Sequence, residues 1–151
     1  MPSKVDMSVN NYDEIIPNLF LGGYKALEDY KKFDLIINCT KDIEFPSSNL
    51  IICKYIRLPV NDEPDEANKL KDLLDSNNVL EIINKYLIEK KNVLVHCKMG
   101  QQRSAIVISC YLMKYFYISS DEAIEYVKAK RPIAFFGQVN FIDILSFFYI
   151  N

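Results

Sequence analysis

The stretch Val93 to Ser104, VLVHCKMGQQRS, joins a short apolar run to a long one through a polar loop. Three consecutive apolar residues, Val93 to Val95, are typical of a parallel strand covered on both faces. From Ser104 to Tyr115 the chain is apolar nearly all round, which predicts a central buried helix. A buried strand, a tight loop and a buried helix in succession indicate an α/β fold.

Short strands and helices are predicted on either side of this stretch. We expect strands at 19–21, 35–39 and 50–58, and helical segments at 24–30, before Asn78, at 79–88, at 119–130 and at 138–148. The helix at 119–130 begins with a capping box formed by Ser119 and Glu122. The predicted fold is one domain with a mixed, mostly parallel sheet of about five strands and helices on both faces. Residues 1–14 are polar and predicted to be a lead-in segment, so the folded domain is expected at 15–151.

The amino-acid composition limits the classes of function that the protein can have. The 151 residues are 50% hydrophobic and 25% charged, with a formal net charge of -2, which suits a single globular domain without a general attraction to nucleic acid or anionic membranes. The longest apolar stretch, 105–113, is too short to span a bilayer, and the first residues lack an apolar signal core. We therefore expect a cytoplasmic protein, with nuclear entry open. Four cysteines without a CxxC pair and a single histidine predict reduced thiols and no metal or other cofactor.

The loop between the predicted strand and helix has the chemistry of an anion site. Backbone N–H groups can converge at a strand-to-helix turn, and the helix N-terminus adds partial positive charge. Gly100 permits a backbone conformation that a side chain would obstruct. Converging donors around Cys97 favour thiolate over thiol, which makes this cysteine a candidate nucleophile. Arg103 can hold two oxygens of a tetrahedral oxyanion, and Ser104 places a hydroxyl beside the sulfur.

C-x5-R between a strand and a helix, here in the fuller form HCxxGxxRS, resembles the signature of the cysteine-dependent phosphatases. VLVHCKMGQQRSA is most similar to the dual-specificity phosphatases, and its HCKMG and RSA parts resemble the slingshot branch. Further segments resemble the same family in the same order: LFLGGYKAL, LIINCT, YIRLPVNDE, CYLMKY and EAIEYVKAKRP. The resemblance covers about nine-tenths of the chain. It implies a protein tyrosine phosphatase-like fold and a two-step reaction through a phosphocysteine, without metal.

The resemblance also implies roles for individual residues. Cys97 is the nucleophile, Arg103 the phosphate clamp, Ser104 the group that assists breakdown of the intermediate, and His96 the residue that orients the loop. The backbone donors to phosphate are Lys98, Met99, Gly100, Gln101, Gln102 and Arg103.

The general acid of the family belongs to a separate loop, and Asp62 matches it. It lies 35 positions before Cys97 and follows Val60 and Asn61. Because Glu63 and Asp65 are close in sequence, spacing alone leaves open which carboxylate reaches the leaving group.

Other candidates have plainer interpretations. Cys53 and Cys110 are expected to be small buried hydrophobes, and so is Cys39, with the alternative that Cys39 forms a protective disulfide with the nucleophile as in some relatives. Arg131 and Arg57 are expected to be structural.

One departure from the family concerns the segment before the last helix. Relatives often carry a Pro-Asn pair there, whereas this chain reads RPIAFFGQVNF. Gln138 in this segment could steer water at the site or serve only as a residue that starts the helix.

The predicted function is therefore a phosphatase acting on phosphotyrosine and phosphoserine or phosphothreonine in proteins. A phosphorylated protein is the expected partner, with no nucleic acid and no membrane. Three alternatives stay open: the same chemistry on a phosphoinositide or RNA 5′ phosphate, a phosphate-binding module without catalysis, and a sulfurtransferase.

Overall fold

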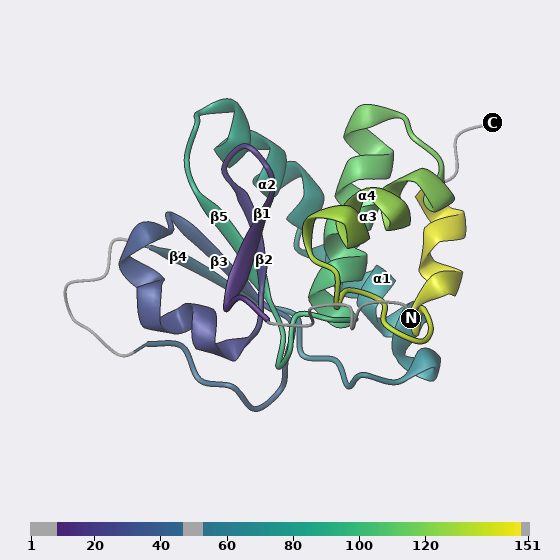
Figure 1. Cartoon of the computed structure of the whole chain (residues 1–151), viewed down its shortest axis with the longest axis horizontal. Helices are drawn as coiled ribbons and strands as arrows, with labels where there is room; N and C mark the ends of the chain where they lie inside the picture. The colour runs from purple at the N-terminus through teal and green to yellow at the C-terminus, as the bar shows by residue number, and fades with distance from the viewer. Residues whose placement is uncertain (1–8, 47–52, 149–151) are drawn as a thin grey trace, which may run out of the picture.

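The protein is described by a computed structural model that covers residues 9–46 and 53–148. One five-stranded sheet runs through the molecule (Figure 1). The strands are β1 (Tyr12–Ile16), β2 (Leu19–Gly22), β3 (Leu35–Asn38), β4 (Lys54–Arg57) and β5 (Val93–His96). The α-helices are α1 (Ala67–Ser76), α2 (Val79–Ile88), α3 (Arg103–Phe116) and α4 (Ser120–Lys130), and the 3-10 helices are η1 (Tyr24–Lys32), η2 (Pro64–Glu66) and η3 (Ile142–Phe148).

The sheet has β5 at its centre, in the order β1-β2-β5-β3-β4. β1 and β2 are antiparallel, and all other neighbours are parallel. Val93 at the start of β5 lies beside Leu19 of β2 and Leu35 of β3. Every residue of β3 and β5 is buried, as expected for parallel strands that are covered on both faces. Because β5 is the central strand, its carboxyl end lies in the middle of the row of strand ends on that side of the sheet.

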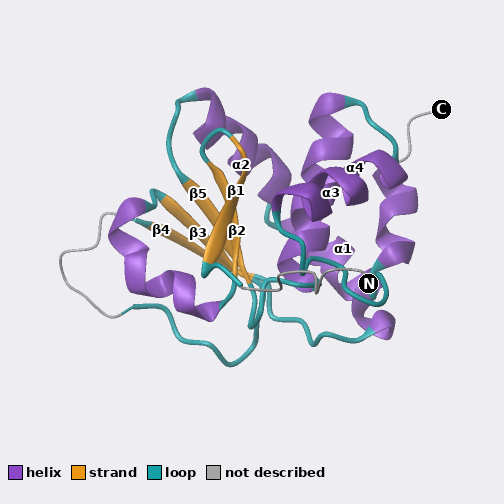
Figure 2. Cartoon of the chain, in the orientation of Figure 1, coloured by secondary structure: helices purple, strands orange, loops and turns teal. Residues whose placement is uncertain are grey.

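Helices cover both faces of the sheet unequally (Figure 2). The larger core packs the four α-helices and η3 against one face, and ten consecutive residues of α3, 104–113, are buried within it. On the other face η1 contributes Ala26 to a smaller cluster around Phe33, Ile36 and Leu94. This arrangement confirms the predicted single α/β domain, with α3 as the buried helix that follows the central strand. No helix in the described part of the chain is long and apolar enough to cross a membrane.

Strand β1 overlaps the lead-in segment that we predicted at residues 1–14. Residues 12–14 belong to the sheet, because the Tyr12 ring packs edge-on against Phe20 and Phe33 at centroid distances of 5.7 and 5.3 Å. The Tyr12 hydroxyl also donates to Asp29 at 2.8 Å. These partners lie in other elements, so the polar composition of the segment gave no indication of a strand.

Among the other predicted elements, the strand at 50–58 and the helix at 138–148 differ most from the structure in their boundaries. The strand expected at 50–58 is observed as Lys54–Arg57, and residues 50–52 lie outside the described part. The last helix starts at Ile142 rather than at Gln138, and it is a 3-10 helix. The helix at 119–130 is confirmed with its capping box, in which Ser119 Oγ accepts from the Glu122 amide at 3.1 Å.

Candidate active site

The cysteine loop, residues 97–103, connects β5 to α3 at the carboxyl end of the central strand. Its carbonyl groups are turned toward donors outside the loop. The acceptor and donor pairs are Lys98 O with the Tyr24 amide (2.9 Å), Met99 O with Arg131 Nη2 (3.0 Å), Gly100 O with Arg131 Nε (3.0 Å) and Gln101 O with the Phe135 amide (2.8 Å). With the carbonyls directed outward, the amides of the loop are left to face its inner side.

The backbone amides of residues 98–103 are unpaired in the part of the chain that the structure describes. Within residues 9–46 and 53–148, none of the backbone N–H groups of residues 98–103 donates a hydrogen bond. Helix α3 begins at the end of the loop with no side-chain cap, so its partial positive charge adds to that of the free amides. A run of unpaired donors at a helix N-terminus is a site for a tetrahedral anion.

Gly100 is needed for the loop to close in this form. Its φ is +68°, in the left-handed region, and a Cβ would lie 2.7 Å from the backbone of Gly22 and 2.8 Å from Arg131 Nη2. Backbone and a buried guanidinium cannot move aside cheaply. Any side chain here would displace the loop from β2.

Cys97 lies at the start of the loop with 3% of its surface exposed. Its Sγ is 3.1 Å from Ser104 Oγ, and Ser104 is itself fully buried in the first turn of α3. A thiolate can only accept, so the hydroxyl is the donor when the sulfur is ionised. The structure therefore brings the candidate nucleophile next to the hydroxyl that the sequence pairs with it.

His96 ends β5 and is completely buried. Burial lowers its pKa to about 4, against the smaller opposing effect of a hydrogen bond to the Cys97 carbonyl. The ring is therefore neutral at physiological pH, and its Nδ1–H donates to that carbonyl at 3.1 Å. This contact suits a residue that holds the loop rather than one that transfers protons.

Arg103 lies beside the cysteine loop and contacts the segment that precedes Asp62. Its Nη1 donates to Val60 O at 3.0 Å, and its Nε is buried without a partner among the described residues. A buried guanidinium N–H without an acceptor is costly unless a ligand satisfies it. An oxyanion held by the loop amides would supply that acceptor.

The predicted acid lies across an open cleft from Arg103. The cleft has a volume of about 470 Å³ and is lined by Lys41, Asp42, Asn61, Asp62, Glu63, Lys98 and Arg103. Asp65, the third carboxylate that the sequence left open, lies in η2 and does not line the cleft. Asp62 and Glu63 both line it, so geometry removes only one of the three candidates.

Comparison with known proteins agrees with this geometry. The model of the dual specificity phosphatase catalytic domain matches residues 19–150. The chain belongs to the dual specificity phosphatase family. It is 34% identical over 125 residues to dual specificity protein phosphatase 8 of Mus musculus, an alignment that covers 78% of this chain and 18% of that protein. The chain thus spans about a fifth of the length of this relative.

Solved structures give the same family. The crystal structure of human DUSP28 superimposes with a TM-score of 0.78 at 25% identity, over 92% of this chain and 93% of that one. A mouse protein assigned to the dual specificity phosphatases, and complexed with zinc tungstate, has a TM-score of 0.78 at 25% identity, over 98% and 92%. The placement in the slingshot branch stays a prediction.

Residues 138–140 connect the two loops of this dual specificity phosphatase domain, and the sequence had suggested only Gln138 of them as a residue near the site. Gln102 of the cysteine loop donates from Nε2 to Gln138 O at 2.7 Å, and its Oε1 accepts from the Asn140 amide at 2.9 Å. Asn140 Nδ2 in turn donates to Asp62 Oδ1 at 2.8 Å. These contacts keep residues 138–140 out of the last helix.

Asn140 was missed because its partners are 38 and 78 positions away in the chain. Gln138 does not line the cleft, and its side-chain amide donates to Asn140 Oδ1. The water-steering role considered for Gln138 stays a prediction.

Glu66 holds the backbone beside the candidate acid Asp62. Its Oε1 accepts from the Asn61 amide at 2.9 Å, and this bond is the main cause of a lowered pKa for the Glu66 carboxyl. Lys41, which also lines the cleft, lies 3.6 Å from the same oxygen. The sequence contained no signal for this support other than the density of carboxylates in 62–66.

Arg131 and Arg57 both have structural partners, as predicted. Arg131 is buried, and besides the two loop carbonyls it donates to Asn10 O at 2.9 Å and to Asp13 at 2.8 Å. Arg57 holds the chain after β3 through Thr40 O and Ile43 O, at 2.8 and 2.7 Å. Both guanidinium groups are therefore bonded to structural acceptors.

The other cysteines differ in their surroundings. All four are free thiols in the structure. Burial raises the pKa of Cys110, raises that of Cys53 to about 11, and raises that of Cys39 well above its ordinary value. For Cys39 the negative charge of Cys97 adds to the effect of burial on the pKa. The Cys39 amide donates to His96 O at 2.8 Å, so Cys39 lies beside the residue that precedes Cys97.

Proposed function

We propose that this domain hydrolyses phosphotyrosine and phosphoserine or phosphothreonine esters in proteins through a phosphocysteine intermediate. The observation that carries the proposal is the orientation of the cysteine loop. Its carbonyls accept from donors outside the loop, while the amides of residues 98–103 have no acceptor among the described residues. Those amides, and the Arg103 Nε that has no partner among the described residues, are the donors to which the three non-bridging oxygens of a phosphoryl group would bond.

In the first step the Cys97 thiolate attacks phosphorus and the ester P–O bond breaks. The phosphoryl charge is held by the loop amides and by Arg103. The leaving oxygen takes a proton from Asp62, which lines the cleft above the loop. The products are a phosphocysteine, the free hydroxyl of the substrate and an Asp62 carboxylate.

In the second step water attacks the phosphocysteine and the P–S bond breaks. Asp62 as carboxylate accepts a proton from the water, and the sulfur leaves as thiolate. The Ser104 hydroxyl, 3.1 Å from Sγ, donates a hydrogen bond to that thiolate as its charge develops. Inorganic phosphate then leaves and the starting state is restored.

The substrate assignment rests on the family and on the open cleft. Asp62 is exposed at its rim, so both aryl and shorter alkyl esters have access to the acid. A panel of phosphotyrosine, phosphoserine and phosphothreonine peptides, with and without vanadate, tests this directly. Faster turnover of inositol lipids or RNA 5′ phosphates than of every peptide would contradict the proposed substrate class.

Two substitutions test the mechanism. Cys97→Ser should abolish phosphate release while retaining phosphopeptide binding, because the hydroxyl does not ionise as the thiol does. Asp62→Ala should lower kcat much more than it changes KM, and Glu63→Ala is the matched control in the same cleft. Full activity of Cys97→Ser, or binding of phosphopeptide without any release by the native chain, would overturn the proposal.

We also propose that the enzyme works inside the cell, where thiols are kept reduced, because its reaction requires a free Cys97. Cys39 is the candidate for protecting that thiol. Peroxide would oxidise the Cys97 thiolate to a sulfenic acid, and condensation with the Cys39 thiol would form a disulfide and release water. Mass spectrometry of tryptic peptides after peroxide treatment, with Cys39→Ser as control, tests for that disulfide.

A further inference from the structure

Gln102 is a buried polar residue of the cysteine loop whose side chain bonds to a distant segment of the chain. Its Nε2 donates to Gln138 O at 2.7 Å, and its Oε1 accepts from the Asn140 amide at 2.9 Å. The donor and the acceptor of this side chain are thus both bound to residues 138–140. Because the side chain is only 6% exposed, loss of either partner would leave a buried polar group unsatisfied, so the segment is firmly attached to the loop.

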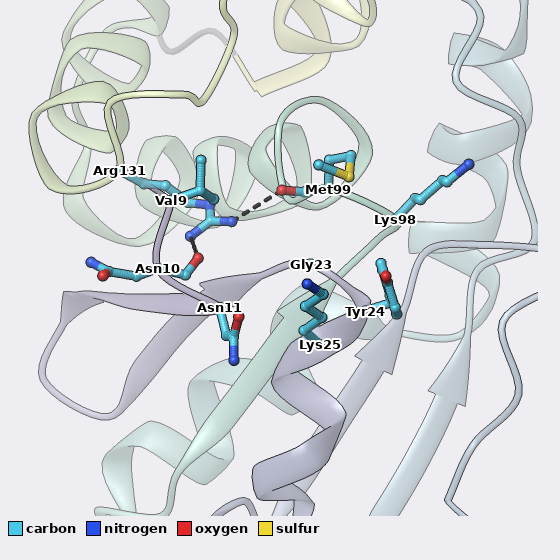
Figure 3. A pocket seen from close by; sticks show the side chains of 9 residues that line it. All are labelled: Val9, Asn10, Asn11, Gly23, Tyr24, Lys25, Lys98, Met99 and Arg131. Atoms are coloured by element: carbon cyan, nitrogen blue, oxygen red, sulfur yellow. Dashed lines mark hydrogen bonds between the residues drawn. The ribbon is translucent and has the colours of Figure 1, made fainter. Parts of the chain in front are cut away.

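The cysteine loop has other supports besides the Gln102 side chain. Arg131 donates to Met99 O at 3.0 Å, as Figure 3 shows at the wall of a neighbouring pocket. The Gln102 carbonyl accepts from the Ile106 amide at 2.9 Å, which joins the end of the loop to the first turn of α3. What the Gln102 side chain adds to this arrangement is the position of residues 138–140.

Residues 138–140 reach the candidate acid through Asn140. Its Nδ2 donates to Asp62 Oδ1 at 2.8 Å, and its Oδ1 accepts from Gln138 Nε2. The Asn140 amide cannot reverse without losing both bonds, so its nitrogen stays turned toward Asp62. The backbone beside Asp62 is held separately by Glu66. Asn140 therefore acts on the side chain of Asp62 rather than on its backbone.

We propose that Gln102 is a positioning residue that directs the proton of Asp62 to the leaving oxygen. It acts through residues 138–140, which hold Asn140 against Asp62 Oδ1. Gln102 also supplies a backbone N–H to the proposed phosphate site, so one residue connects the bound phosphoryl group with the acid. The inference rests on the proposed function, because it needs Asp62 to be the general acid.

The contact with Asn140 makes the two oxygens of Asp62 chemically unequal. A protonated carboxyl has one O–H donor, and its other oxygen accepts. Since Oδ1 accepts from Asn140, the proton of the acid form lies on Oδ2. In the first step the Oδ2–H bond breaks as the leaving oxygen takes this proton, and in the second step Oδ2 takes a proton from the attacking water.

The test compares two esters that need the acid to different degrees. A nitrophenolate leaves without a proton more readily than a phenolate, so the ratio of kcat/KM for phenyl phosphate to that for 4-nitrophenyl phosphate measures proton donation. Gln102→Met fills similar space without an amide, and it should lower this ratio by about threefold to tenfold, as expected for the loss of side-chain hydrogen bonds. Gln101→Met, the same change at the neighbouring position, should leave the ratio at its native value.

Gln102→Glu is a graded variant at the same position. The carboxylate keeps an acceptor for the Asn140 amide but has no donor for Gln138 O, so the ratio should lie between those of the native chain and Gln102→Met. The added charge beside the phosphate affects both esters alike and cancels in the ratio. Urea unfolding identifies the conditions in which each variant is folded, and Gln102→Glu carries the test where Gln102→Met is not.

Double variants show whether the effect passes through the acid. In an Asp62→Ala background, Gln102→Met should not lower the ratio further, because no proton remains to be directed. Combined with Asn140→Ala, it should lower the ratio no more than the larger of the two single changes, because both act through one contact. A purely structural role of Gln102 would reduce the turnover of both esters by the same factor and would leave the ratio unchanged.

Three results would overturn the inference alone: a native ratio in a folded Gln102 variant, an equal decrease with Gln101→Met, or a full decrease in the Asp62→Ala background. Failure of Asp62→Ala itself to lower the ratio, or failure of the native chain to hydrolyse any phosphate ester, would instead overturn the proposed mechanism, and the role of Gln102 with it.

Discussion

Replacing Arg131 with methionine should both destabilise the domain and weaken anion binding. The guanidinium is 1% exposed and donates to four acceptors: Gly100 O, Met99 O, Asn10 O and Asp13 Oδ2. Methionine fills similar space but donates nothing, so three carbonyls and one carboxylate lose their partner. Breaking a buried ion pair from one side costs about 3–5 kcal/mol. Asp13 keeps 15% exposure and partial access to water, so we expect about 3–4 kcal/mol.

Urea unfolding at neutral pH measures this loss. Lys130→Met, at the exposed neighbouring position, is the matched control and should stay within about 0.5 kcal/mol of the native chain. Arg131→Lys keeps the charge but loses the planar set of guanidinium donors. Its free energy of unfolding should therefore lie between those of Arg131→Met and Lys130→Met.

Anion binding by Arg131→Met can be measured separately from its stability. Without Arg131 the Met99 and Gly100 carbonyls lose the donor that turns them outward, so the adjoining amides lose their alignment on the anion. Under conditions in which Arg131→Met is folded, its affinity for vanadate should fall by about tenfold to hundredfold. A loss of stability under 1 kcal/mol, or unchanged vanadate affinity in the folded variant, would refute the reasoning.

Three further predictions follow from individual contacts. Asn140→Ala removes the side-chain amide that donates to Asp62. The kcat should fall by about threefold to tenfold for substrates with poor alkyl leaving groups, and little for those with acidic phenols. An equal loss of kcat across leaving groups in a Brønsted plot would refute this role. Ser104→Ala should slow only the second step, by about tenfold to hundredfold, so that a phosphocysteine burst appears in quenched-flow experiments; a steady state without a burst would contradict it. His96 has a pKa of about 4 in the folded state, below its ordinary 6.5, so the unfolded chain binds the extra proton and the free energy of unfolding should fall by up to about 3 kcal/mol as pH drops from 6.5 to 4. His96→Asn should flatten that fall in urea titrations, and an unchanged slope would exclude His96 as its source.

The parts of the fold that could be predicted are those whose cause lies within a few residues. Strand β5 is apolar at three consecutive positions because both its faces are covered, and the start of α4 is marked by the reciprocal bonds of Ser119 and Glu122. Such patterns are visible in a short window of sequence.

The parts that could not be predicted depend on distant partners. Strand β1 exists because Tyr12 packs on Phe20 and Phe33, and because Asp13 meets a guanidinium 118 positions away. The sequence predicted that the last helix begins at Gln138. The side chain of Gln102 instead binds the backbone of Gln138 and Asn140 in a non-helical conformation. Long-range contacts override local propensity in both places.

The same distinction applies within the site. The spacing of Cys97, Gly100 and Arg103 identifies which residues belong to the cysteine loop, because the family signature lies in one short stretch. It does not say why the amides face inward. That orientation depends on every outward carbonyl having a donor, and those donors come from the segment after β2, from the end of α4 and from residue 135. The proposed anion binding by this loop therefore depends on the tertiary structure, and we expect a chain with an intact signature but without Arg131 to bind phosphate poorly.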